Sequence, residues 1–157
     1  MEILKIPLMI KKDYDNLIAE QYVSRIAFHG KHPYIAPFIY VFDGKFLYFL
    51  STKYGKKIEL IRKNPHVGVE IENISENLTK YSFVTLQGSI QEVTNNNEKQ
   101  KVKERFVNMI EEKNLSINIL AALGHSPEEP IQAILKEDKS FVWKLVDVIN
   151  ITGVKNP

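Results

Sequence analysis

Two aromatic segments separated by an Asp-Gly pair constrain the fold of this chain more than any other feature of its sequence. The first segment, PYIAPFIYVF, covers residues 33–42, and the second, KFLYFLS, covers residues 45–51. Asp43 and Gly44 lie between them, and this dipeptide favours a tight hairpin turn because both residues tolerate positive φ angles. The sequence therefore predicts an antiparallel pair of strands here.

Pro37 lies in the middle of the first of these strands. Since proline has no N–H group to donate, it does not fit a position where both neighbouring strands pair with it. We therefore expect residue 37 at a sheet edge, at a bulge or at a site without a partner strand. The aromatic side chains around it are expected to form core, and the alternative is a flat apolar slot for an aromatic ligand.

Four further segments have the pattern of strands, and hairpin-type connections link the early ones. They cover residues 23–28, 66–72, 81–93 and 141–149. Gly88 is expected at a bulge or a bend of the long strand that contains it. Six strands connected in this way favour a mainly β fold, an antiparallel β-barrel with flanking helices, and 157 residues are expected to form a single domain, residues 1–157.

Helices are predicted at three places between these strands. The first follows Asp13, which would be its N-cap, and the second follows Ser51 and Thr52, which would cap it. The third and clearest covers residues 97–114, where apolar side chains recur at helical spacing. The segment 115–138 is irregular, and a segment of this kind could cover a cleft.

Composition and charge exclude several classes of site. The sequence has no cysteine, so disulfides, thiolate metal sites and cysteine nucleophiles are excluded. The four histidines have no metal-ligand spacing, and we expect no metal site; they are His29, His32, His66 and His125. A net charge of +2 provides no strong field for nucleic acid, and no apolar stretch reaches the roughly 18 residues of a membrane span. The N-terminal apolar run is too short for a signal peptide, so we predict a cytoplasmic protein.

The segment STKYGKK, residues 51–57, is the most informative candidate site. It joins a predicted strand to a predicted helix, where free N–H groups and the positive end of the helix dipole converge. Lysines at a helix N-terminus oppose this dipole, and a bound anion would offset the conflict. We therefore prefer a phosphate site here. The alternative is that two hydroxyls cap the helix while the lysines are solvated.

The order of these features resembles the pyridoxamine-phosphate-oxidase-like flavoproteins, in the branch that includes the nitroimidazole-resistance proteins. The similarity is most specific over residues 33–72, in the strand pair, the TKYG loop, the helix KKIELIRKNP and the strand HVGVEIE. YSFVTLQGSIQEV and FVWKLVDVINITG are similar to the following and closing strands of that family. The resemblance implies a six-stranded split barrel that forms a homodimer and binds flavin mononucleotide (FMN) in clefts at the dimer interface.

The resemblance also implies which residues contact the cofactor. Lys56 and Lys57 match the basic pair that binds the phosphate, and Trp143 would reach the flavin ring from the partner subunit. The full set is Pro37, Phe38, Ile39, Leu50, Ser51, Thr52, Lys53, Lys56, Lys57 and Trp143. The sequence departs from the family at the arginine and histidine pair that true pyridoxamine-phosphate oxidases use for their substrate, which has no counterpart here.

These observations predict an FMN-dependent oxidoreductase that acts on a small organic molecule. The flavin would carry hydride or single electrons, which suits a sequence without a convincing catalytic acid–base pair. One alternative keeps the barrel and replaces FMN with a deazaflavin. The sequence is also compatible with a non-catalytic flavin- or ligand-binding protein and with a single-strand nucleic-acid binder, the last disfavoured by the near-neutral charge.

Overall fold

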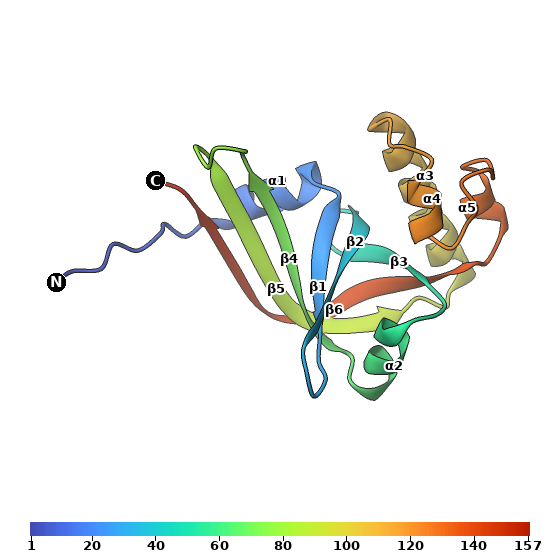
Figure 1. Cartoon of the computed structure of the whole chain (residues 1–157), viewed down its shortest axis with the longest axis horizontal. Coiled ribbons are helices and arrows are strands. Elements are labelled where there is room, and N and C mark those ends of the chain that lie inside the picture. The colour runs from blue at the N-terminus through green and yellow to red at the C-terminus, as the bar shows by residue number, and fades with distance from the viewer.

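The computed structural model describes all residues from Met1 to Pro157, and its main feature is a closed antiparallel barrel of six strands (Figure 1). Around the barrel the strand order is β1-β2-β3-β6-β5-β4. The strands are β1 (Val23–Phe28), β2 (Tyr34–Phe42), β3 (Leu47–Thr52), β4 (His66–Ile74), β5 (Tyr81–Glu92) and β6 (Ser140–Lys155). The predicted six-stranded barrel is therefore confirmed, including the hairpin at Asp43 and Gly44.

Five helices flank the barrel, and none of them is both long and apolar enough to cross a bilayer. They are α1 (Lys11–Glu20), α2 (Lys56–Lys63), α3 (Asn96–Glu112), α4 (Ile119–Ala122) and α5 (Ala133–Lys136). Figure 1 shows α3, α4 and α5 grouped on one side of the barrel, with α2 at its lower end. The irregular segment 115–138 thus contains two short helices beside α3.

The buried apolar residues form two clusters on opposite faces of the barrel wall. The first fills the barrel interior, where Phe28, Phe38, Phe49 and Trp143 make tilted and edge-to-face ring contacts with centroids 5.7–6.3 Å apart. The second lies between the outer face of the wall and helices α3–α5, with Phe106 fully buried at its centre. Alternating side chains of β2 and β3 enter the two clusters in turn, as a period of two requires.

The pairing of β5 with β6 is irregular at Gly88. The register between β5 and β6 shifts between Gln87 and Ser89, which confirms the predicted bulge at Gly88. The extra residues of the bulge, 147–149, lie in β6 opposite Gly88, and Asp147 among them adopts φ 51. The closing strand is therefore longer than the predicted residues 141–149, and it ends at Lys155.

Asp13 is not the N-cap of the first helix. The helix begins at Lys11 with Ile10 at the cap position, and no side chain caps it. Asp13 lies in the first turn, where its carboxylate accepts a hydrogen bond of 2.9 Å from Lys155. The local sequence predicted that Asp13 would cap the helix, whereas in the structure Asp13 forms an ion pair with the last strand.

Candidate functional site

A cleft opens where the barrel wall is split between β2 and β3. These strands pair only over Tyr40–Phe42 and Leu47–Phe49, while the first half of β2 pairs with β1 and the end of β3 pairs with β6. The cavity in this gap has a volume of about 330 Å³. It is lined by Val23, Tyr34, Ala36, Pro37, Phe38, Ile39, Leu50, Thr52, Lys57, Ile119, Ala122 and Leu123.

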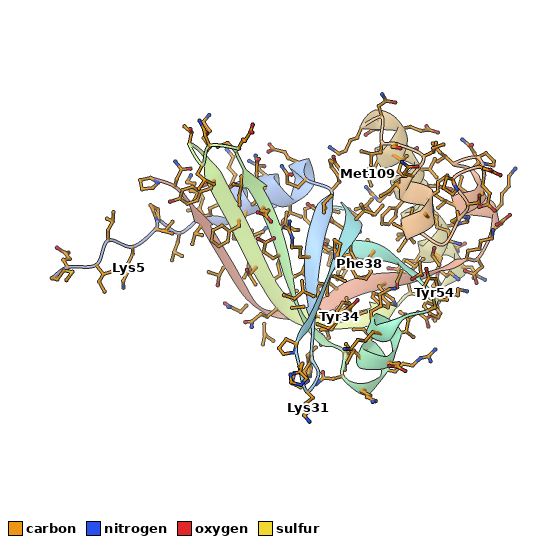
Figure 2. All side chains as sticks on the ribbon, viewed as in Figure 1. Lys5, Lys31, Tyr34, Phe38, Tyr54 and Met109 are labelled. Atoms are coloured by element: carbon orange, nitrogen blue, oxygen red, sulfur yellow. The ribbon has the colours of Figure 1, made fainter.

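Pro37 lies at the unpaired edge that the sequence predicted for it. It opposes Arg25 of β1 on one side and has no partner from β3 on the other. Because neighbouring residues of a strand direct their backbone groups to alternate sides, part of the peptide backbone around Pro37 faces the cleft. Figure 2 shows Tyr34 and Phe38 on the same strand. The Phe38 ring is only 7% exposed and packs inside the barrel, so this residue offers mainly its backbone to a ligand.

The N-terminus of α2 closes one end of the cleft. Ser51 and Thr52 do not cap this helix, because they form the last residues of β3 and pair there with Phe141 and Ser140. The cap position is Gly55, whose φ of 104 suits glycine, and no side chain caps the helix. The N–H groups of the first helical turn therefore lack a side-chain acceptor, which is the arrangement that binds anions.

Lys57 is the one charged residue that lines the cleft. Its ammonium donates hydrogen bonds to Thr52 Oγ1 at 2.6 Å and to the carbonyl of Tyr54 at 3.0 Å. An ammonium carries three donors, so one remains for a ligand. Burial lowers the pKa of Lys57. Lys56 is exposed at the same helix end, with its Nζ 5.5 Å from the centre of the Tyr34 ring.

Helix α4 covers the cleft from outside the barrel. Ile119, Ala122 and Leu123 contribute to the lining, so the segment 115–138 covers a cleft, as its irregular sequence allowed. The chain turns away directly afterwards at Gly124, which adopts φ +88 and lies close to the carbonyl of Lys139. Sequence reasoning missed these lining residues, although the apolar run before Gly124 was a usable signal.

Three of the expected cofactor contacts lie elsewhere. Ser51 is 1% exposed, and its hydroxyl donates to the carbonyl of Thr52. Lys53 does not line the cleft, and its Nζ lies 3.4 Å from the carboxylate of Asp138. Trp143 is 3% exposed within the ring cluster of its own barrel and does not line the cleft, and its reach to a partner's flavin stays a prediction. The other predicted residues meet at the cleft. Lys56 lies at its end, and six line it: Pro37, Phe38, Ile39, Leu50, Thr52 and Lys57.

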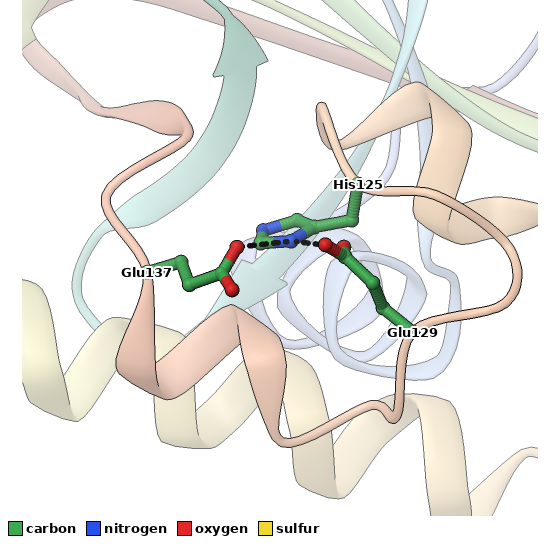
Figure 3. A group of neighbouring side chains, drawn as sticks. All are labelled: His125, Glu129 and Glu137. Atoms are coloured by element: carbon green, nitrogen blue, oxygen red, sulfur yellow. Dashed lines mark hydrogen bonds and ion pairs between the residues drawn. The ribbon is translucent and has the colours of Figure 1, made fainter.

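A second polar group lies behind α4, around the buried His125 (Figure 3). Its Nδ1 lies 3.0 Å from Glu129 and 3.9 Å from Glu137. These three side chains are close enough to hold a metal ion in principle. The ammonium of Lys139, however, lies 2.6 Å from Glu129 and 2.9 Å from Glu137, so a lysine already supplies the positive charge between the carboxylates. We interpret the group as a structural network that holds the segment after α4.

A larger hollow of about 590 Å³ lies at the rim of the barrel beside the β1–β2 turn. Its lining consists mainly of glycines and polar residues, including His29, Lys31 and His66. No helix begins among its lining residues. The smaller cleft is therefore the better candidate, because its lining combines an apolar wall with donors at one end.

Several solved structures share this fold. A FAD-binding protein from Mesorhizobium loti is 17% identical, with 98% of this chain and 100% of that chain covered and a TM-score of 0.71. A candidate 5-nitroimidazole antibiotic resistance protein from Bacteroides thetaiotaomicron is 17% identical, with 96% and 87% covered and a TM-score of 0.65. The FAD-binding protein from Mycobacterium smegmatis is 12% identical, with 98% and 100% covered and a TM-score of 0.61.

Among curated proteins, no match was found. The sequence does match the family described as pyridoxamine 5'-phosphate oxidase, over residues 11–132. This stretch contains β1 to β5, the split between β2 and β3, and the helix that closes the cleft. The fold and the sequence therefore agree, and the chain belongs to the pyridoxamine 5'-phosphate oxidase family.

Proposed function

We propose that this chain is a flavin-dependent oxidoreductase that holds FMN in the cleft between β2 and β3 and acts on a small organic substrate. The observation that carries the proposal is the division of the cleft into an apolar slot and a cationic end. Lys57 and the first turn of α2 form that end, while aliphatic and aromatic residues line the remainder. FMN has the same division between a flat ring system and a phosphate.

The donor set fits a phosphate by its chemistry. The phosphate would accept hydrogen bonds from the free N–H groups of α2, the third proton of the Lys57 ammonium and Lys56. The ring would lie against the backbone of Pro37 to Ile39 and the side chain of Leu50. Family membership supports this assignment, as do the two FAD-binding proteins of similar fold.

The cleft offers little for acid–base catalysis by side chains. No carboxylate and no histidine lines it, and its titratable groups are Lys57 and Tyr34. A bound flavin supplies hydride or single-electron transfer, so the chain needs only to bind it, orient it and exclude water. The side chains of Ile119 and Leu123 contribute to that exclusion from the α4 side.

We also propose that the protein is a cytoplasmic homodimer in which the partner completes the cleft. Apolar side chains remain exposed beside the cleft, with Val23 43% and Ile35 63% exposed. Burying them against a second copy would remove apolar surface from water. The variant Ile35→Glu is expected to shift the mass measured by light scattering from dimer to monomer. Leu78→Glu is the control, because Leu78 is exposed to about the same extent (62%). If the wild type is monomeric at micromolar concentration, the proposal that two subunits share the cleft is refuted.

The first experiment is a visible absorption spectrum of the purified protein before and after incubation with FMN and desalting. Retained flavin bands with quenched fluorescence are expected. The variant Lys56→Ala/Lys57→Ala is then expected to bind FMN at least tenfold more weakly. Each charge-assisted hydrogen bond contributes about 1.5–3 kcal/mol, which is roughly a ten- to hundredfold change in affinity.

Lys63→Ala is the matched control, because Lys63 is exposed at the opposite end of the same helix. It is expected to leave FMN affinity unchanged. Equal FMN affinity in wild type and in Lys56→Ala/Lys57→Ala would remove the phosphate role from α2. Protein that stays colourless with FMN but binds a deazaflavin would assign the cleft to that cofactor, and retained flavin that no donor reduces would indicate a binding protein.

A further inference from the structure

Helix α4, which covers the cleft, is joined to a buried histidine by the two residues that follow the helix. Leu123 lines the cleft, and Gly124 turns the chain with a φ of +88, so that His125 lies outside the lining. The backbone N–H of His125 donates a hydrogen bond of 2.9 Å to the carbonyl of Leu120. The carbonyl of Leu123 accepts a hydrogen bond from the hydroxyl of Ser140. A shift of His125 would therefore displace one wall of the cleft.

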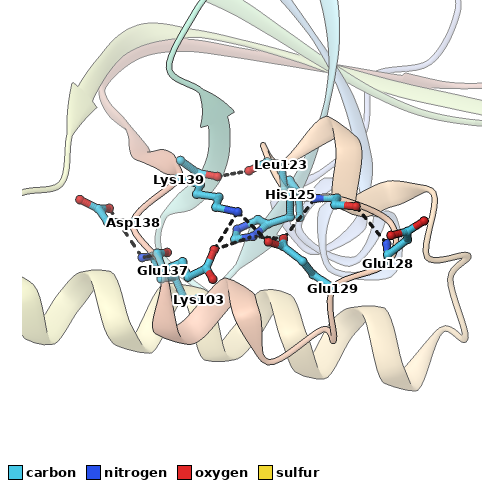
Figure 4. A network of polar contacts seen from close by, with 10 residues as sticks. Lys103, Leu123, His125, Glu128, Glu129, Glu137, Asp138 and Lys139 are labelled. Atoms are coloured by element: carbon cyan, nitrogen blue, oxygen red, sulfur yellow. Dashed lines mark hydrogen bonds and ion pairs between the residues drawn. The ribbon is translucent and has the colours of Figure 1, made fainter.

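Figure 4 shows the charged side chains that surround His125. Its ring is only 2% exposed, and Nδ1 lies 3.0 Å from a carboxylate oxygen of Glu129 and 3.9 Å from one of Glu137. The ammonium of Lys139 lies 2.6 Å and 2.9 Å from the same two carboxylates. We call these four residues the histidine network.

The histidine network has one negative charge in excess when His125 is neutral, because two carboxylates then face a single ammonium group. Protonation of His125 would bring the count to two positive and two negative charges. A hydrogen bond between charged groups is roughly twice as strong as one between neutral groups. The charged ring should therefore hold the network together more firmly than the neutral ring.

No other charged group changes this count. From α3, Lys103 donates to the backbone carbonyl of Glu137 at 3.3 Å, while its ammonium lies 3.7 Å from Asp138. Glu128 and Asp138 appear in Figure 4 but form no ion pair with His125. The charge of the ring is thus balanced by the carboxylates of the histidine network alone.

The ring can change its charge while Glu129 keeps its own. A histidine side chain gains or loses its proton between about pH 5 and pH 8. The hydrogen bond from Lys139 lowers the pKa of Glu129 below its ordinary value of 4.5, so this carboxylate stays negative over the same range. Acidification within the range therefore adds a positive charge beside a fixed negative one.

We propose that His125 is a positioning residue, whose protonation holds α4 more firmly over the cleft and slows the exchange of the bound molecule. The effect on α4 depends on the histidine network alone. The effect on exchange rests on the proposed function, because it takes the bound molecule to be FMN. Leu123 transmits the effect, since it lines the cleft and lies two residues before the ring.

The first measurement is backbone hydrogen exchange of residues 119–123 in the full chain, with EDTA present, at about pH 6 and about pH 8. Protection factors, which correct for the intrinsic pH dependence of exchange, are expected to be about five- to tenfold higher at the lower pH in wild type. His125→Gln keeps an amide donor but gains no charge, so its protection factors should not change with pH. His66→Gln is the matched control, because His66 is exposed at the barrel rim and contacts Ser89.

Glu137→Gln tests the charge count itself. With this carboxylate removed, the histidine network is balanced when His125 is neutral and has one positive charge in excess when it is protonated. The rise in protection at the lower pH is therefore expected to disappear. If His125→Gln does not fold, this variant still decides, because the Glu137 side chain is 44% exposed and its loss leaves the ring in place. Melting temperatures equal to wild type at about pH 8 establish that each variant is folded.

The second measurement follows FMN dissociation through the recovery of flavin fluorescence. Dissociation should be about five- to tenfold slower at about pH 6 than at about pH 8 in wild type and in His66→Gln, and equally fast at both in His125→Gln. Protection that depends on His125 without such a change in dissociation would overturn its role at the cleft. Equal protection at both pH values in wild type, or the wild-type rise in Glu137→Gln, would overturn the proposal as a whole. If FMN does not bind, the proposed function fails, and hydrogen exchange still decides whether His125 controls α4.

Discussion

Replacing Gly88 with alanine tests whether the bulge between β5 and β6 depends on the absence of a side chain at this position. A Cβ atom at this position would lie 2.7 Å from the carbonyl oxygen of Val146, 3.2 Å from Leu145 Cδ1 and 3.3 Å from Val148 Cγ2. The first contact is with backbone that pairs across β5 and β6, so it cannot be relieved by a side-chain rotation. We therefore expect Gly88→Ala to lower the free energy of unfolding.

The magnitude follows from comparison with a second strand glycine. Overpacking of this kind costs about 1–3 kcal/mol. Gly68 lies on the adjacent strand opposite Gln87, and a Cβ there would meet no atom within 4 Å. Gly68→Ala is expected to gain about 0.5–1 kcal/mol, because alanine loses less conformational freedom on folding. The two variants should therefore differ by roughly 1.5–4 kcal/mol.

Urea denaturation followed by Trp143 fluorescence measures this difference. With a dependence on urea of about 2 kcal/mol per molar, the midpoints of the two variants should differ by roughly 0.7–2 M. Equal midpoints for Gly88→Ala and Gly68→Ala would refute the reasoning, because the bulge would then tolerate a side chain.

Two further predictions concern buried and half-buried polar contacts. Tyr40→Phe removes the 2.6 Å hydrogen bond to the carbonyl of Ile18 and leaves that carbonyl buried. Urea denaturation should therefore show a free energy of unfolding that is lower by about 1–3 kcal/mol. Tyr81→Phe is the control and is expected to leave the free energy of unfolding unchanged. The hydrogen bond from Lys144 lowers the pKa of Glu98 below its ordinary value of 4.5. This stabilisation is present above pH 4.5 and is lost as the pH falls through the lower folded value, so Glu98→Gln should weaken the acid dependence of stability below pH 4.5. If the pH dependence of the free energy of unfolding below pH 4.5 is the same in Glu98→Gln as in wild type, this prediction is contradicted.

Local sequence signals were sufficient for the strands and for one end of the cleft. The Asp-Gly turn and alternating apolar residues depend on neighbours in the chain, and they located β1 to β5 closely. Pro37 indicated an unpaired strand edge for the same reason, since the missing N–H group is a property of that residue alone. Lys56 and Lys57 likewise indicated the cationic end of the cleft through their position at a helix start.

Only the tertiary structure decided which side chains face the cleft. Ser51, Lys53 and Trp143 lie beside or within predicted site segments, but packing turned them into the barrel or toward Asp138. The contribution of α4 depends on bringing residues about 70 positions apart in sequence, Leu50 and Ile119, to the same cavity, which no local pattern encodes. The sequence by itself determined the strand pattern and the charge at the start of α2, because these depend on neighbouring residues. The fold alone determined the enclosure of the cleft, because this enclosure depends on long-range packing.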